Sequence, residues 1–139
     1  LTITHEDMTR FWVTIGEGVR FVLRSIEDME GGEVFVPKIP SLRVMDLAET
    51  IAPDAEKEIV GIRPGEKIHE ILVTEEEARH AREFESRIVI EPELSFFSDA
   101  RWDGGEPLPE GFRYTSGNNE EWLSRDELHA MIEGLGYDL

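Results

Sequence analysis

The feature that most restricts how this chain can fold is a helix-start pattern that occurs three times along it. A Ser or Thr precedes a Glu by three residues at Thr14–Glu17, Thr74–Glu77 and Ser124–Glu127. In such a capping box the hydroxyl accepts a hydrogen bond from a free N–H group of the first turn, and the carboxylate reaches back to the capping residue. The sequence therefore predicts separate helices that begin at these three positions.

Strand-like segments alternate with the predicted helices. Strands are expected at residues 8–13, 33–37, 58–62 and 86–92. We expect segment 58–62 to be buried, and we expect a further helix that Ser41 caps and Pro53 closes. The helices that begin at the capping boxes are expected to end near residues 31, 82 and 133, and residues 98–120 are rich in loops. The alternation predicts a mixed α/β fold class.

Composition excludes several classes of protein. The 139 residues are enough for one domain with a core, and the net charge of −17 argues against binding to nucleic acid or to an anionic membrane. Without cysteine there is no disulfide and no thiolate metal site. Because no apolar run is long enough for a membrane span and no signal peptide is recognisable, we expect a cytoplasmic protein. The chain begins at Leu1 within an alternating segment, so we expect a fragment or a processed product.

No catalytic motif stands out in the sequence. Gly16 and Gly18 resemble a dinucleotide fingerprint, but they lie at a capped helix start and position 21 is Phe21 instead of the third glycine. A G-x-S-x-G elbow and a Tyr-x-x-x-Lys pair are both absent from the sequence. With 31 acidic residues, the proximity of two carboxylates carries little information.

The segment GIRPGEKIHE, residues 61–70, places cations on a stiff turn in an acidic chain. The guanidinium of Arg63 can bind two phosphate oxygens at once, and Glu66 is suited to sugar hydroxyls. Arg10 lies among large apolar residues in MTRFW and needs a partner, because an unpaired buried charge is costly. Two interpretations remain open: an anionic ligand with hydroxyl groups, or pairing of both arginines with local carboxylates.

Four segments together resemble a known family. MTRFWVTIGEGVRFVL, GGEVFVPKIPSLRVMDLAE, GIRPGEKIHEILVTEEEAR and YTSGNNEEWLSRDEL are similar to the C-terminal part of bacterial inverting UDP-N-acetylglucosamine 4,6-dehydratases. These enzymes are extended short-chain dehydrogenase/reductases with an NAD(P)-binding, Rossmann-type core. The resemblance implies that residues 1–139 are the C-terminal, sugar-nucleotide-binding region, with most of the Rossmann core missing. It also implies that residues 1–40 or so pack on the absent nucleotide-binding domain, and that residues from about 95 to 139 form a C-terminal tail and helix.

The resemblance also assigns roles to residues. It implies that Arg10 and Arg63 contact the diphosphate of a UDP-sugar, that Glu66 binds the ribose and that Thr9 lies beside the diphosphate. The family removes water across C4 and C6 of UDP-N-acetylglucosamine with inversion at C5, using NADP. Its catalytic and cofactor-binding residues lie in the N-terminal half, so this chain is expected to hold no cofactor, to be inactive alone, and to associate with that half and with further copies. A sister UDP-sugar epimerase and a non-catalytic acidic protein-interaction module remain the alternatives.

Overall fold

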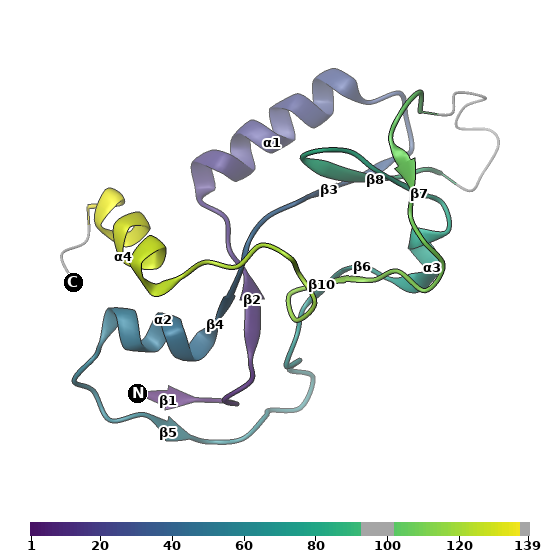
Figure 1. Cartoon of the computed structure of the whole chain (residues 1–139). Coiled ribbons are helices and arrows are strands. Elements are labelled where there is room, and N and C mark those ends of the chain that lie inside the picture. The colour runs from purple at the N-terminus through teal and green to yellow at the C-terminus, as the bar shows by residue number, and fades with distance from the viewer. Residues whose placement is uncertain (93–101, 137–139) are drawn as a thin grey trace. The chain divides into compact units, whose positions relative to one another are not determined.

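The computed structural model describes residues 1–92 and 102–136 and confirms the mixed α/β fold class (Figure 1). The helices are α1 (Ile15–Asp28), α2 (Val44–Ile51), α3 (Glu75–Ala78) and α4 (Arg125–Gly134). The strands are β1 (Thr2–Ile3), β2 (Thr9–Phe11), β3 (Val34–Pro37), β4 (Ser41–Arg43), β5 (Glu58–Ile59), β6 (Ile71–Val73), β7 (Ala81–Glu83), β8 (Arg87–Ile90), β9 (Glu106–Pro107) and β10 (Tyr114–Thr115). None of the described helices is long and apolar enough to cross a membrane.

The chain forms two compact units, each assembled from segments that are distant in the sequence. The described residues of unit 1 come from Leu1–Trp12, Pro40–Glu70 and Thr115–Leu139. Those of unit 2 come from Val13–Ile39 and Ile71–Tyr114. Every residue proposed for ligand binding from the sequence therefore belongs to unit 1.

Unit 1 contains α2, α4 and two strand pairs. β1 runs parallel to β5, whereas β2 runs antiparallel to β4 and places Arg10 opposite Leu42. α2 and α4 pack against each other, and Arg125 of α4 forms an ion pair with Asp46 of α2 at 3.0 Å. Leu42 and Leu128 are completely buried, so they form the centre of a core that holds β2 in place.

Unit 2 is built on a sheet with the strand order β3-β8-β7-β9. Val89 of β8 is completely buried, and Val36 of β3 lies opposite Ile88 in the antiparallel register. Arg87 of β8 pairs with Asp28 at the end of α1, and its guanidinium lies over the rings of three aromatic residues, Phe35, Phe84 and Trp102.

The three capping boxes are confirmed, because α1, α3 and α4 each show both reciprocal hydrogen bonds. These hydrogen bonds also lower the pKa of the capping glutamates. The hydroxyl and N–H of Thr14 lower the pKa of Glu17, and the N–H and hydroxyl of Thr74 lower that of Glu77. Local sequence alone was sufficient to place these helix starts.

The expected helix cap at Ser41 is wrong, because Ser41 belongs to β4. It lies opposite Phe11 of β2, and its backbone N–H donates to the carbonyl of Glu121 at 2.9 Å. α2 consequently begins at Val44, and its capping position, Arg43, makes no side-chain capping hydrogen bond. Pairing with a strand 30 residues earlier therefore overrides the local capping signal.

Two further boundaries differ from the sequence-based expectation. The helix after Thr74 ends at Ala78 instead of near residue 82, because Ala81 joins the sheet opposite Ile90. Segment 58–62 is a strand only at its first two residues, and its apolar side chains are exposed instead of buried, at Ile59, Val60 and Ile62. The parts of the expected C-terminal tail at 95–101 and 137–139 lie outside the described residues.

An exposed apolar face runs along α1. The helix has no buried residue, and Ile15 is 89% exposed. The other large apolar side chains on this face are also exposed: Val19, Val22, Leu23, Ile26 and, just after the helix, Met29. Residues of α1 and β3, among them Phe21 and Phe35, line an open apolar pocket beside this face. Within unit 2, the apolar side of an amphipathic helix is therefore left without a full cover.

Candidate functional site

Arg10 is held in one orientation by backbone carbonyls and one carboxylate. Its Nη1 donates to the carbonyl of Thr9 at 2.6 Å and to that of Ile68 at 3.2 Å. Its Nε lies 3.5 Å from Oε1 of Glu70, and the side chain is 28% exposed. The local carboxylate pairing that the sequence left open is thus present at Arg10. Among the described residues its Nη2 has no partner, so one edge of the guanidinium remains available to a ligand.

Arg63 lies on a turn with glycine on both sides. Gly61 has φ +86° and Gly65 has φ +85°, a conformation that a residue with a Cβ adopts only under strain. The backbone N–H of Glu66 donates to the carbonyl of Arg63 at 3.1 Å, which closes the turn. The side chain of Arg63 is exposed and has no partner within the described part of the chain. The local pairing seen at Arg10 is therefore not seen at Arg63.

Glu66 stabilises the same turn from within. Its Oε2 accepts from the backbone N–H of Arg63 at 3.1 Å, and its Oε1 accepts from the hydroxyl of Thr4 at 3.2 Å. Each carboxylate oxygen has two lone pairs, so both oxygens keep capacity for a further hydroxyl donor. The carboxylate thereby fixes the turn and remains able to bind a ligand.

Thr9 lies deeper than the sequence suggested. It is 4% exposed, and its Oγ1 lies 2.8 Å from Nδ1 of His69 and 2.7 Å from Oγ of Ser116. Its backbone N–H donates to the carbonyl of Ile68 at 3.0 Å. The Thr9 hydroxyl is therefore engaged inside the protein, and it ties β2 to the end of segment 61–70.

The structure brings together residues that sequence reasoning did not connect. Ser116 is completely buried and is hydrogen-bonded to Thr9 and Glu70, although it lies 107 residues from Thr9. The sequence shows His69 only as the neighbour of Glu70. In the structure its side chain is exposed, and its Nδ1 reaches Oγ1 of Thr9. No local pattern marks Ser116, because its partners come from two distant segments.

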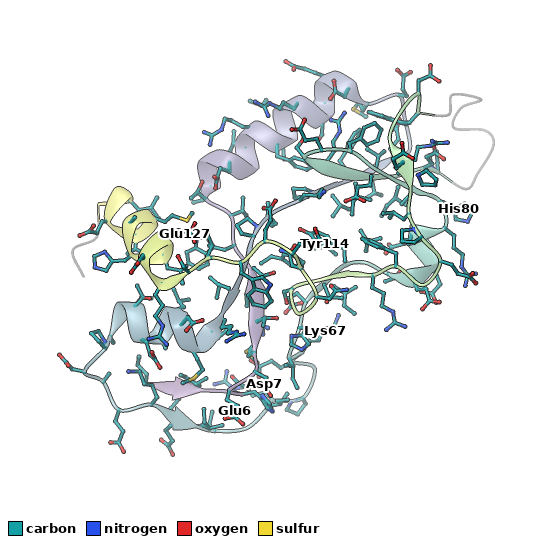
Figure 2. The ribbon with its side chains drawn as sticks, in the orientation of Figure 1. Glu6, Asp7, Lys67, His80, Tyr114 and Glu127 are labelled. Carbon is teal, nitrogen blue, oxygen red and sulfur yellow. The ribbon has the colours of Figure 1, made fainter. Side chains whose placement is uncertain are left out.

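The charges around the site are of both signs. Lys67, labelled in Figure 2, follows Glu66 on the turn, is exposed, and has no partner among the described residues. Glu6 and Asp7, also labelled there, are exposed just before β2. In a chain with net charge −17, an anion at this turn must be held by a few placed cations, because the overall field repels it. Within the described residues, no group of His, Asp and Glu side chains could hold a metal ion.

Residues 1–92 match the model of a family described as polysaccharide biosynthesis protein, and the chain belongs to that family. It is 43% identical over 139 residues to a UDP-N-acetylglucosamine 4,6-dehydratase (inverting) from Campylobacter jejuni, covering 95% of this chain and 42% of the relative. It is 31% identical over 143 residues to a UDP-glucose 4-epimerase from Rickettsia massiliae, covering 99% of this chain and 42% of the relative. These relatives confirm the resemblance seen in the four sequence segments.

A solved structure has the same fold. The X-ray structure of Pen from Bacillus thuringiensis matches 98% of this chain and 41% of its own chain, with a TM-score of 0.79 and 26% identity. This chain thus spans 42% of the length of the two curated relatives and a similar share of the solved one.

Proposed function

We propose that this chain is the UDP-sugar-binding part of a nucleotide-sugar 4,6-dehydratase that acts on UDP-N-acetylglucosamine in bacterial polysaccharide or glycan synthesis. The observation that carries the proposal is the exposed Arg63 guanidinium, which has no partner in the described part of the chain. It lies on a turn whose segment also supplies the carbonyl that holds Arg10. The relatives whose printed names include UDP-sugars support a nucleotide sugar as the ligand.

Each site residue has a distinct part in the proposed complex. Arg63 binds the diphosphate with its planar fork, and Arg10 adds its remaining free edge. Glu66 accepts hydrogen bonds from the ribose through the spare lone pairs of its carboxylate. Thr9 lies next to Arg10 along β2 and keeps that strand in place, since its own hydroxyl is engaged by His69 and Ser116.

The proposed reaction removes water across C4 and C6 of the sugar and inverts C5, and NADP supplies the hydride acceptor when bound. The described residues do not fit a dinucleotide. Gly16 and Gly18 lie inside α1, whose start is capped by Thr14 and Glu17, and not in a strand-to-helix turn. We therefore assign the cofactor and the catalytic groups to a part of the longer protein outside this chain. We expect the chain alone to be inactive.

The exposed face of α1 supports a second element of the proposal, which concerns partners. A 14-residue helix with an exposed apolar side is stabilised when another surface covers it. We propose that the nucleotide-binding half of the longer protein covers this face, and that copies of the isolated chain associate through it. The same face is also what a non-catalytic interaction module would present. The epimerase alternative rests on the relative from Rickettsia massiliae.

Calorimetric titration of the 139-residue chain with UDP at low salt tests the ligand. We expect weak binding that Arg63→Ala abolishes. Arg79→Ala is the matched control, because Arg79 is an exposed arginine of unit 2 and its removal changes the net charge equally. If wild-type chain does not bind UDP, or if both variants weaken binding alike, Arg63 is not a ligand-binding residue. An interaction module would show no UDP binding at all.

A further inference from the structure

We propose that Ser116 is the positioning residue of the UDP site, which it serves through Arg10 without touching the ligand. The proposal rests on the function proposed above and deepens it. Ser116 is completely buried, so its hydroxyl is not a candidate for direct contact with a ligand. Its effect on binding must pass through the groups to which it is hydrogen-bonded.

Arg10 is held by two carbonyls and one carboxylate, those of Thr9, Ile68 and Glu70. Ser116 is hydrogen-bonded directly to two of these residues, Thr9 and Glu70. The Ser116 hydroxyl donates to the carbonyl of Thr9 at 3.2 Å, the same carbonyl that accepts from Arg10. On the other side, the N–H of Glu70 donates to Oγ of Ser116 at 2.9 Å, and the N–H of Ser116 donates to the carbonyl of Glu70 at 2.9 Å. Ser116 thereby fixes the distance between β2 and the backbone of Glu70, whose carboxylate faces Arg10 Nε.

The directions of the bonds in this cluster depend on where the single Ser116 hydroxyl proton goes. That proton has two acceptors within reach, the carbonyl of Thr9 at 3.2 Å and Oγ1 of Thr9 at 2.7 Å. The proposal places it on the carbonyl that Arg10 shares, so that the Thr9 hydroxyl donates to Ser116. In that arrangement the Thr9 hydroxyl has no proton left for His69, and Nδ1 of His69 donates to Thr9 Oγ1. The proposal therefore predicts the His69 tautomer that is protonated at Nδ1. Ser116 accepts from Glu70 and Thr9 and is fully satisfied.

Close packing of Gly117 against His69 independently supports the cluster of Thr9, His69 and Ser116. A Cβ at residue 117 would lie 2.6 Å from both Cγ and Nδ1 of the His69 ring. Those atoms belong to the near side of the ring, so the whole ring would have to move. Glycine is therefore needed at position 117 for the His69 ring to reach Thr9. Ser116 thus contacts β2 through Thr9, and Gly117 packs against the His69 ring.

The decisive experiment is a double-mutant cycle in the 139-residue chain, with UDP affinity measured by calorimetry. We expect Ser116→Ala to weaken UDP binding about tenfold, which corresponds to about 1.4 kcal/mol. In an Arg10→Ala background, Ser116→Ala should weaken it no further. Ser116→Cys, which keeps a weak donor of similar size, should recover part of the loss. An equal loss with and without Arg10 would show a general structural role and overturn the proposal.

The matched control is Ser41→Ala. Ser41 is also a completely buried serine of unit 1, and its hydroxyl accepts from Nδ2 of Asn119 at 3.0 Å. The Ser41→Ala variant should lose free energy of unfolding as Ser116→Ala does, while its UDP affinity stays within about twofold of wild type. If Ser41→Ala weakens UDP binding as strongly as Ser116→Ala, positioning by Ser116 is refuted. Where Ser116→Ala does not fold, Gly117→Ala provides the test, since it displaces His69 from Thr9 Oγ1 and keeps the Ser116 hydroxyl. It should weaken UDP binding, and unchanged affinity would overturn the proposal.

A second readout does not depend on UDP. In ¹⁵N NMR spectra, the Arg10 Nη1–H signal should be protected from exchange in wild-type chain and lost in Ser116→Ala, and His69 should show the Nδ1–H tautomer. If wild-type chain binds no UDP, the proposed function fails, and the Arg10 signal still decides the positioning. An Arg10 signal that persists unchanged in Ser116→Ala overturns the positioning proposal whatever UDP does.

Discussion

Replacing Arg10 by alanine should cost folding stability as well as affinity, whereas replacing Arg63 should cost affinity alone. Arg10 donates to two carbonyls and faces Glu70 at 3.5 Å, and Arg63 has no side-chain partner among the described residues. Hydrogen bonds to a charged group contribute about 1.5–3 kcal/mol each, and water replaces part of this at a site that is 28% exposed. We therefore expect Arg10→Ala to lower the free energy of unfolding by about 2 kcal/mol, and Arg63→Ala by less than about 0.5 kcal/mol.

Urea unfolding followed by tryptophan fluorescence measures this difference. Trp102→Phe is used as the common background, because Trp102 is in unit 2 whereas Trp12 and Trp122 are in unit 1 with the site. The fluorescence then follows unit 1. A saturating amount of UDP should stabilise the background protein by mass action, and neither arginine variant should gain as much.

Two results would refute this reasoning. Equal destabilisation by Arg10→Ala and Arg63→Ala without UDP would show that the contacts of Arg10 do not support the fold. Full stabilisation of Arg63→Ala by UDP would show that Arg63 does not bind the diphosphate. Arg79→Ala again controls for the loss of one positive charge.

Further predictions concern the helices. The N–H and hydroxyl of Thr74 lower the pKa of Glu77 in the folded protein below 4.5. The ionised Glu77 carboxylate therefore stabilises the fold fully above pH 4.5, and this stabilisation is lost as the pH falls through the lower pKa of the folded state. Glu77→Gln should therefore reduce the loss of stability between about pH 5 and pH 3 in urea titrations. Leu128→Ala should cost about 2–5 kcal/mol of unfolding free energy in the same assay, whereas exposed Leu135→Ala should cost less than about 0.5 kcal/mol. Val22→Glu should shift the chain toward monomer in sedimentation velocity. Arg24→Glu, which changes another exposed residue of α1, should not. Equal self-association of both variants would contradict the role of the apolar face.

The parts of the fold that short-range chemistry decides were predictable. The three capping boxes involve partners three residues apart, so Thr14, Thr74 and Ser124 identified their helices without tertiary information. Ser41 carries only half of this signal, because Val44 and not an acid follows it by three residues. Its strand partner Phe11 is distant in sequence, and the sheet prevails. The expectation that segment 58–62 is buried failed for a related reason. Apolar composition does not show whether another part of the chain covers a segment.

The candidate site was predictable in part. The chemistry of guanidinium and carboxylate groups, together with the resemblance, brought Arg10, Arg63 and Glu66 to attention. The sequence left open whether the arginines pair locally, and the structure gives a different answer for each: Arg10 faces Glu70, whereas Arg63 has no partner in the described residues. Ser116 lies in the segment YTSGNNEEWLSRDEL, which contributes to the resemblance, but nothing in that segment distinguishes this serine. Its partners, Thr9 and Glu70, are brought to it only by the folding of the chain.

The order of segments in unit 1 has a consequence for biosynthesis. This unit is not complete until Thr115 and the residues after it have been made, because Ser116 closes the cluster around Thr9 and Glu70. On the ribosome, β2 emerges more than a hundred residues before the serine that completes its surroundings. A nascent chain cut short before that point would lack the closed cluster, so ligand capture would begin only after Ser116 has been made.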